Sequence, residues 1–195
     1  MRLLLVRHGE TEWNADRRLQ GQRDIPLSLI GEQQARALRP IIESHAPETV
    51  MTSPLLRALR TAETLGHGAT STDPRWMEAD LGVWTGRTAS DLLESGEPYA
   101  EWRAGRATPP GGESFEALTE RVTAAAAELM TAGGVALVVT HGGPIRALVH
   151  HLIGLAPERI VPVDPGSLTI IDVDDQPRLR AYSVHAAAAR LAPPD

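Results

Sequence analysis

The chain has 195 residues and a formal net charge of −6, and it contains no cysteine. A chain of this length can bury the core of one globular domain. The absence of cysteine excludes disulfides and cysteine-based metal or nucleophile chemistry, and the acidic balance without a basic run argues against nucleic acid as the main partner.

Apolar runs alternate with helical patterns along the chain. Strands are expected at 3–6, 49–52, 135–140, 168–173 and near 180–184, and helices are expected to begin near Ser28, Ser53, Ala89, Ser114 and Pro144. This alternation predicts a single-domain α/β fold, a three-layer sandwich with a mostly parallel sheet and helices on both faces. We expect the domain to span residues 1–185, with a C-terminal tail over 186–195 that frays.

Two of the predicted strands end in a histidine followed by glycine. The first strand is followed by Arg7, His8 and Gly9, and the third, at 135–140, is followed by His141 and Gly142. Ligands of open α/β sheets bind outside the carboxyl ends of the strands. The glycines allow close approach of the backbone, and the helix start after His141 offers free N–H groups to an anion. The pair favours a functional site over an incidental polar turn.

These residues, together with further motifs, resemble the histidine phosphatase superfamily, also called the phosphoglycerate mutase-like family. A lone Arg-His-Gly triplet would be weak, but here the motifs occur in the family's order and span most of the chain. They are Arg7 to Gly9 with Glu10 to Asn14, Arg18 to Gly21, Pro26 to Ser28 and Gly31 to Ala35; Ser53 to Ala58 with Thr61 and Ala62; Glu78 with Gly82 to Gly86; Pro110 to Ser114; and Thr140 to Gly143.

The resemblance implies phosphate transfer through the protein. His8 holds the place of the phosphorylated histidine, and a neutral imidazole is an accepted covalent nucleophile. Arg7, Arg57 and His141 hold the positions that stabilise the charge of the transferring phosphoryl group. Glu78 holds the acid/base position that protonates the leaving alcohol.

Four further residues resemble the family's phosphate or substrate contacts, with ordinary loop polarity as the alternative for the first two: Asn14, Gln20, Gly21 and Gly142. We interpret Asp80, the nearest competitor of Glu78, as a turn residue, and we place Trp102 near the substrate pocket. The remaining histidines have no partner at metal-ligand spacing, so we expect no metal and no organic cofactor.

The family contains both mutases and phosphatases. Only three basic residues, Arg87, Arg103 and Arg106, lie in the short stretch from Ala79 to Ser114, where mutases carry extra basic residues. The end of this stretch, from Pro110 to Ser114, resembles the phosphatase branch, which includes broad acid phosphatases and α-ribazole phosphatases. Thr85 departs from that branch, which often has an acidic residue there, and this leaves the substrate open.

The resulting prediction is a phosphomonoesterase that hydrolyses small phosphorylated metabolites through a phosphohistidine. The alternatives are a cofactor-dependent phosphoglycerate mutase and a non-catalytic module that binds phosphorylated ligands on the same fold. No stretch approaches the roughly 20 apolar residues of a membrane helix, and no signal peptide is visible. We therefore expect a cytoplasmic location and a small phosphorylated substrate, with neither nucleic acid nor membrane as partner. The oligomeric state stays open, with a homodimer as one option.

Overall fold

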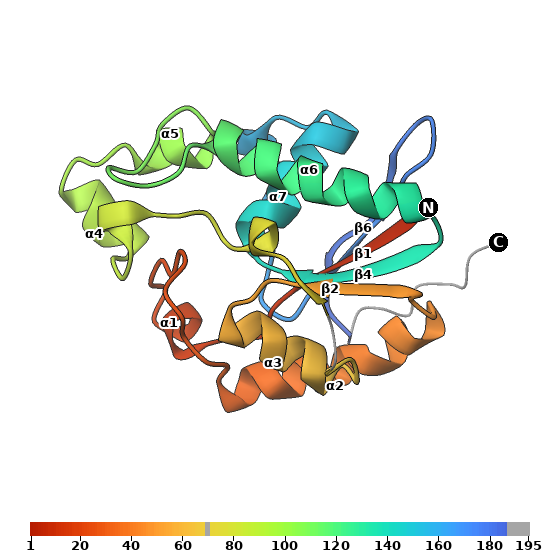
Figure 1. Cartoon of the computed structure of the whole chain (residues 1–195). Coiled ribbons are helices and arrows are strands. Elements are labelled where there is room, and N and C mark those ends of the chain that lie inside the picture. Colours follow the sequence, from red (N-terminus) through yellow and green to blue (C-terminus); the bar gives the residue numbers. More distant parts are fainter. Residues whose placement is uncertain (69–70, 187–195) are drawn as a thin grey trace.

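The computed structural model describes residues 1–68 and 71–186, and within them the chain forms one six-stranded sheet (Figure 1). The strand order is β3-β2-β4-β1-β5-β6. Strands β3, β2, β4 and β1 run parallel to one another, whereas β5 is antiparallel to both of its neighbours, β1 and β6. The strands are β1 (Arg2–Arg7), β2 (Thr49–Thr52), β3 (Ser71–Thr72), β4 (Val135–Thr140), β5 (Leu168–Asp172) and β6 (Arg178–Val184).

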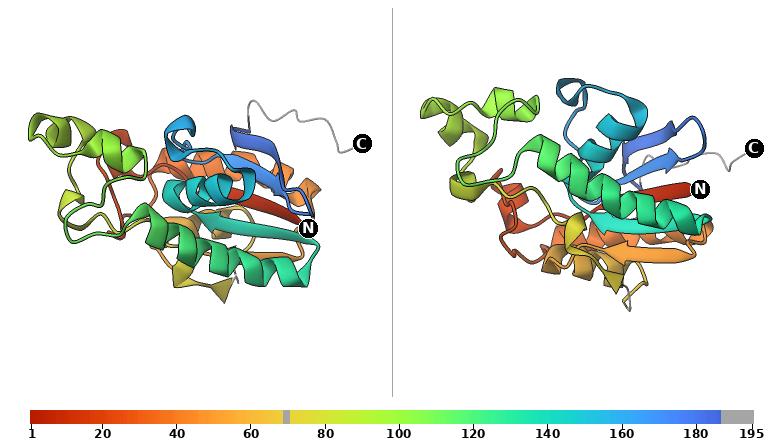
Figure 2. Two further views of the ribbon diagram at one scale, coloured as in Figure 1. Left: turned by 90° about the horizontal axis from the view of Figure 1, so that it is seen from above. Right: turned by 45° about the horizontal axis from the view of Figure 1, so that its top comes forward.

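Helices cover both faces of this sheet, which confirms the predicted three-layer α/β fold. Helices α2 and α3 lie on one face, and α6 and α7 lie on the other (Figure 2). None of the helices in the described parts of the chain is long and apolar enough to cross a membrane. The helices are α1 (Glu12–Ala15), α2 (Leu29–Ser44), α3 (Leu56–Thr64), α4 (Ala89–Glu94), α5 (Tyr99–Arg103), α6 (Phe115–Ala132) and α7 (Gly142–Ile153), with 3₁₀ turns η1 (Pro74–Trp76), η2 (Gly82–Trp84) and η3 (Pro157–Arg159).

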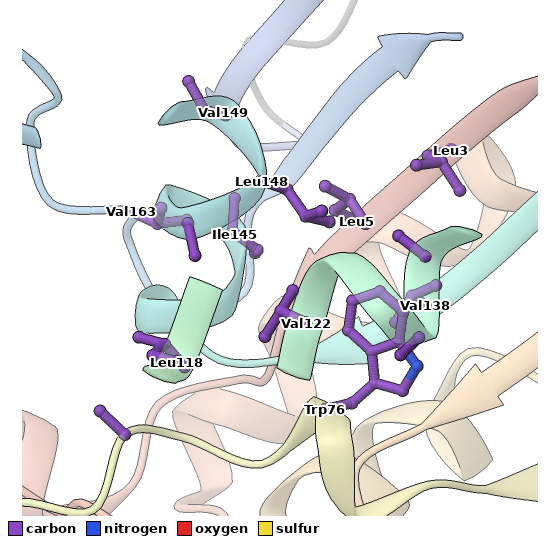
Figure 3. Close-up of a cluster of buried hydrophobic side chains, with 14 of the residues drawn as sticks. Leu3, Leu5, Trp76, Leu118, Val122, Val138, Ile145, Leu148, Val149 and Val163 are labelled. Carbon is purple, nitrogen blue, oxygen red and sulfur yellow. The ribbon is translucent and has the colours of Figure 1, made fainter. Parts of the chain in front are cut away.

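Strand β1 is buried on both faces because its side chains alternate between two apolar clusters. Leu3 and Leu5 pack with residues of α6 and α7 (Figure 3), and Leu4 and Val6 pack with residues of α2 and α3. All four side chains are fully buried. A continuous apolar run is typical of a strand that is covered on both sides.

The predicted strands and the five predicted helices are present, with shifted ends. Helix α3 begins at Leu56 rather than at Ser53, because Leu55 is still extended. Helix α7 begins at Gly142 rather than at Pro144, because the two glycines before the proline already adopt helical geometry. Sequence analysis missed β3, α1 and α5, which are too short to show a period. Of the tail expected at 186–195, residues 187–195 lie outside the described residues.

The sheet brings the two histidines together at one edge. In the register of β1 with β4, Arg7 lies beside Thr140, so that His8 and His141 follow as neighbours at the carboxyl ends of the strands. Strand β2 lies on the other side of β4 and ends at Thr52, next to Val139. Helices α1, α4 and α5 lie beyond this edge (Figure 1).

Two glycines fix the segment that follows His8 against helix α2. A Cβ built on Gly9 would lie 2.3 Å from the carbonyl oxygen of Gly31, and a Cβ on Gly31 would lie 2.1 Å from that of Glu10. Real Cβ atoms do not approach backbone this closely, so the contact requires glycine on both sides. The start of α2 thus serves as a rigid support for the His8 loop.

We therefore expect Gly31→Ala to lower the free energy of unfolding by about 2 kcal/mol or more, because backbone on both sides must shift. Urea unfolding measures the loss. Gly68→Ala is the matched control, because its Cβ would meet only the Glu63 side chain at 3.6 Å. A Gly31→Ala protein as stable as the Gly68→Ala protein would show that the loop does not depend on this contact.

Candidate active site

A cavity of about 210 Å³ opens at the carboxyl edge of the sheet. All predicted site residues except His141 line it: Arg7, His8, Asn14, Gln20, Gly21, Arg57, Glu78 and Gly142. His141 is fully buried close by, and its ring centroid lies 5.1 Å from that of His8. Residues from distant parts of the chain are thus brought together around the two histidines.

The hydrogen bonds of His8 fix its tautomer. Its Nδ1 lies 2.7 Å from the carbonyl oxygen of Gly9, and its Nε2 accepts a hydrogen bond of 3.2 Å from the Nε of Arg57. A carbonyl oxygen can only accept, so Nδ1 carries the proton and Nε2 carries the lone pair. The ring therefore presents an unprotonated nitrogen, as a nucleophile requires.

Arg57 is the centre of the site. Its guanidinium is held by the carbonyl oxygens of Arg23 at 2.7 Å and Gly21 at 2.8 Å, while its Nε also donates to the Nδ1 of His141 at 3.3 Å. Helix α3 begins at Leu56, so Arg57 lies in its first turn, as predicted. The side chain is fully buried, and this burial lowers its pKa to about 10.

His141 is held between Arg57 and strand β2. Because its Nδ1 accepts from Arg57, its Nε2 carries the proton and donates to the Oγ of Ser53 at 2.7 Å. The family resemblance implies that His141 donates to a phosphate oxygen, whereas in this structure its one N–H is engaged by Ser53. Ser53 positions this ring, and it was part of a recognised motif without an assigned role.

Burial and positive charge keep both imidazoles neutral. The pKa of His8 is lowered well below its usual value of 6.5, first by desolvation and then by the charges of Arg57 and Arg7. The pKa of His141 is lowered well below 6.5 for the same reasons, with desolvation again the largest cause. Arg7 donates to the carbonyl oxygen of Val163, and its Nε has no partner within the described chain.

Glu78 is held at the cavity by the start of α7. Its Oε1 accepts from the backbone N–H groups of Ala79 and Gly143, each at 3.0 Å. A Cβ on Gly143 would lie 2.2 Å from this oxygen, whereas one on Gly142 would meet only the Arg7 guanidinium at 3.6 Å. Glycine is thus required at 143, and the group that approaches it closely is Glu78.

A network of hydrogen bonds fixes the backbone around Glu78. Arg121 donates to the carbonyl oxygens of Met77 at 2.9 Å and Glu78 at 3.0 Å, and it pairs with Glu113 at 2.7 Å. Asp80 accepts from the N–H of Gly82 at 2.9 Å, which confirms its interpretation as a turn residue. Glu78, unlike Asp80, lines the cavity together with His8.

The predicted binding residues differ in what holds them. Asn14 caps α1 with its carbonyl oxygen, 3.1 Å from the backbone nitrogen of Thr11. Gln20 is buried, and its Oε1 has no hydrogen-bond partner within the described residues. Gly21 has a positive φ of 52°, and its carbonyl oxygen supports Arg57, so its role is structural as well as steric.

Comparison with known proteins agrees with this geometry. A family model of the histidine phosphatase superfamily (branch 1) matches residues 3–184. The chain belongs to this superfamily. The chain is 34% identical, over an alignment of 207 residues, to the probable phosphoglycerate mutase GpmB of Yersinia enterocolitica. This match covers 98% of this chain and 94% of that protein. GpmB of Salmonella paratyphi C is 39% identical over 165 residues, or 80% of this chain and 76% of the relative.

Solved structures of phosphatases are also similar to this histidine phosphatase superfamily member. The mycobacterial glucosyl-3-phosphoglycerate phosphatase in complex with VO3 superposes with a TM-score of 0.87 at 30% identity, over 93% of this chain and 98% of that one. The putative α-ribazole-5'-P phosphatase of Escherichia coli K-12 superposes with a TM-score of 0.81 at 33% identity, over 93% and 95% of the two chains.

The structure adds cavity residues to those that the sequence predicted. Trp102 lines the cavity as expected, with Tyr99 beside it at a ring-centroid distance of 5.4 Å. Phe115 and Arg146 also line it and were missed. Arg146 lies one helical turn after Gly142, but it stands within an apolar run, so no local signal in the sequence points to the site. In the described chain no group of three or more His, Asp or Glu residues could hold a metal ion, and metal independence stays a prediction.

We expect stability to fall as pH drops below 6.5. The two buried histidines are neutral in the folded state, whereas the unfolded chain takes up protons near pH 6.5. At higher pH neither histidine is protonated in either state. Below pH 6.5, each histidine lowers the free energy of unfolding by up to about 1.4 kcal/mol per pH unit. This loss ends when the pH reaches the lowered pKa of that histidine in the folded state.

Urea unfolding between pH 6.5 and 5 measures this slope. The two buried histidines together contribute to the slope of the free energy of unfolding against pH. His8→Asn should remove about half of that contribution, because one buried titrating group is gone. His151→Asn, at an exposed position of α7, should leave it unchanged. Equal slopes in all three proteins would contradict a neutral buried pair.

Proposed function

We propose that this protein is a phosphomonoesterase that hydrolyses small phosphorylated metabolites through a phosphohistidine at His8. The observation that carries the proposal is the lone pair of His8 Nε2, fixed by the bond from Nδ1 to Gly9 and lying within reach of Arg57. A second cation, Arg7, lines the same cavity. A nucleophile between two guanidinium groups suits attack on a dianionic phosphate ester.

The reaction then follows in two displacements. The Nε2 lone pair attacks phosphorus, the bond to the ester oxygen breaks, and Glu78 gives its proton to the departing alcohol. A water molecule next attacks the phosphohistidine, Glu78 takes up one of its protons, and inorganic phosphate leaves with His8 neutral again. Arg57 and Arg7 stabilise the charge on the equatorial oxygens in both steps. No step in this scheme calls on a metal or an organic cofactor.

Two observations favour a small substrate and water as acceptor. A volume of about 210 Å³ is below the ~300–1,000 Å³ that is typical of pockets for drug-sized ligands, so it suits a small metabolite. Several similar solved structures are named as phosphatases. The alternative, a phosphoglycerate mutase, is favoured by the names of the relatives in Yersinia and Salmonella.

Phosphorus NMR separates the two activities. We expect release of inorganic phosphate from simple monoesters without a bisphosphorylated primer, and slow or absent conversion of 3-phosphoglycerate to its isomer. For transfer to a bound acceptor to be a hundredfold faster than hydrolysis, its activation barrier must be about 2.7 kcal/mol below that of hydrolysis. Rapid quench with labelled substrate should trap an acid-labile phosphoenzyme in the parent protein. His8→Ala should abolish both this label and turnover. Isomerisation that needs primer and outpaces phosphate release would favour the mutase instead.

Glu78→Gln should slow esters of poor leaving groups far more than esters of acidic phenols. An alkoxide needs the proton in the transition state, whereas a nitrophenolate leaves without it. The measurement is the ratio of kcat/KM for an alkyl and an aryl phosphate. Asp80→Asn is the matched control, because the amide oxygen can still accept from Gly82. An equal loss on both esters would point to a structural role for Glu78.

A further inference from the structure

The segment that carries Glu78 belongs to neither a helix nor a strand. Residues 77–81 lie between the 3₁₀ turns η1 and η2. Irregular backbone beside the core needs hydrogen-bond partners from elsewhere in the chain. One side chain, Arg121 of α6, supplies several of them. It donates to the carbonyl oxygens of Met77 at 2.9 Å and Glu78 at 3.0 Å, and to that of Arg75 in η1 at 2.7 Å.

Every N–H group of the Arg121 side chain is used. A guanidinium has five such donors in one plane. Two of them form a forked pair with Glu113, from Nε to Oε1 at 2.7 Å and from Nη2 to Oε2 at 2.8 Å, and the other three donate to the carbonyl oxygens just named. The forked pair sets the plane of the guanidinium, and the buried neighbours Leu118 and Val122 fix α6 in the core. Glu113 belongs to the Pro110 to Ser114 motif, and sequence analysis assigned it no chemical role.

The bond from Arg121 to the backbone of Glu78 also bears on the carboxyl group of Glu78. The carbonyl group of Glu78 and the N–H of Ala79 belong to one planar peptide unit. Arg121 and the Nε2 of Gln22, the latter at 3.1 Å, hold the carbonyl end of this unit. The N–H end donates to the Oε1 of Glu78 at 3.0 Å. Arg121 therefore fixes the direction of a donor that itself holds the carboxyl group.

The two oxygens of the Glu78 carboxyl group are not equivalent. Oε1 accepts from the N–H groups of Ala79 and Gly143, each at 3.0 Å, whereas Oε2 accepts no hydrogen bond from the described residues. A proton on Oε1 would oppose two donors, so the proton of the acid form lies on Oε2. Because Glu78 lines the cavity, Oε2 is the oxygen that can give a proton to a leaving group there.

We propose that Arg121, oriented by Glu113, is a positioning residue for proton transfer: it fixes the peptide unit after Glu78 and thereby directs Oε2 toward the ester oxygen. This proposal rests on the proposed function, because it concerns the acid of that reaction. Oε2 gives its proton to the ester oxygen as the bond from that oxygen to phosphorus breaks, and the resulting carboxylate keeps its two N–H bonds on Oε1. Without Arg121 the peptide unit can rotate, and the acid loses its alignment with the leaving group.

The test measures how strongly the rate depends on the leaving group. Arg121→Met should lower the ratio of kcat/KM for an alkyl phosphate to kcat/KM for nitrophenyl phosphate by about tenfold or more, as Glu78→Gln does, because only the alkoxide needs the proton. The ratio does not depend on the fraction of the protein that is folded, so a loss of stability alone leaves it unchanged. Equal losses on the two esters would assign a structural role to Arg121 and overturn the proposal.

Two milder variants decide the matter if Arg121→Met does not fold. Arg121→Lys keeps the positive charge but has three donors in place of five, so the ratio should still fall by about fivefold or more. Glu113→Gln keeps the arginine but replaces one acceptor of the forked pair by an amide N–H₂ group, so the ratio should fall by about threefold or more. A wild-type ratio in Arg121→Lys would show that charge alone is sufficient, and it would overturn the proposal.

Arg75→Met is the matched control. Arg75 also connects this region to α6, through ion pairs with Asp73 and Glu128 at 2.6 Å each, but none of its side-chain hydrogen bonds goes to Glu78. The variant should change the ratio by less than about twofold, because the peptide unit after Glu78 keeps its partners. A fall as large as that of Arg121→Met would show that any loss of a link to α6 has this effect, and it would overturn the specific role of Arg121.

A double variant tests whether Arg121 acts through Glu78. In the Glu78→Gln protein, Arg121→Met should lower the ratio by less than about a further twofold, because no acid is left to position. A further tenfold fall would assign another route to Arg121 and overturn the proposal. If no monoester releases phosphate, the phosphatase assignment fails and this proposal fails with it. If Glu78→Gln lowers the ratio and Arg121→Met does not, only the positioning role fails.

Discussion

The site depends on one buried guanidinium. Arg57 is shared through its Nε between His8 and His141, and it is held in place by the carbonyl oxygens of Gly21 and Arg23. This arrangement fixes both rings, selects their tautomers and disfavours their protonation. His8, the proposed nucleophile, is therefore kept neutral by its burial and by the charge that lies beside it.

Close contacts of the backbone set the positions of the other groups. The Gly9–Gly31 contact fixes the loop after His8 on helix α2, and Gly143 lets α7 approach the carboxylate of Glu78. Two N–H groups hold that carboxylate, while Arg121 holds the carbonyl oxygen of the same residue. Groups placed by backbone contacts lose little conformational freedom when the reaction begins, which favours catalysis by positioning.

The electrostatics of the cavity bear on the choice between hydrolysis and transfer. Sequence analysis counted three basic residues in the stretch before Ser114, and the structure places only Arg103 at the cavity. Arg146, from a different part of the chain, also lines the cavity.

The sequence by itself determined the layered fold, the pair of strand-end histidines and the residues around them. These features rest on local apolar runs and on motifs whose residues are adjacent in the chain. Only the tertiary structure decided the bond between Gly143 and Glu78, which are 65 positions apart, and the placement of Arg146. Arg146 lies within a run of buried apolar residues in α7, so the sequence pattern predicts core there. Its partners come from α5 and η3, and their approach depends on how these segments pack, which a local pattern does not encode.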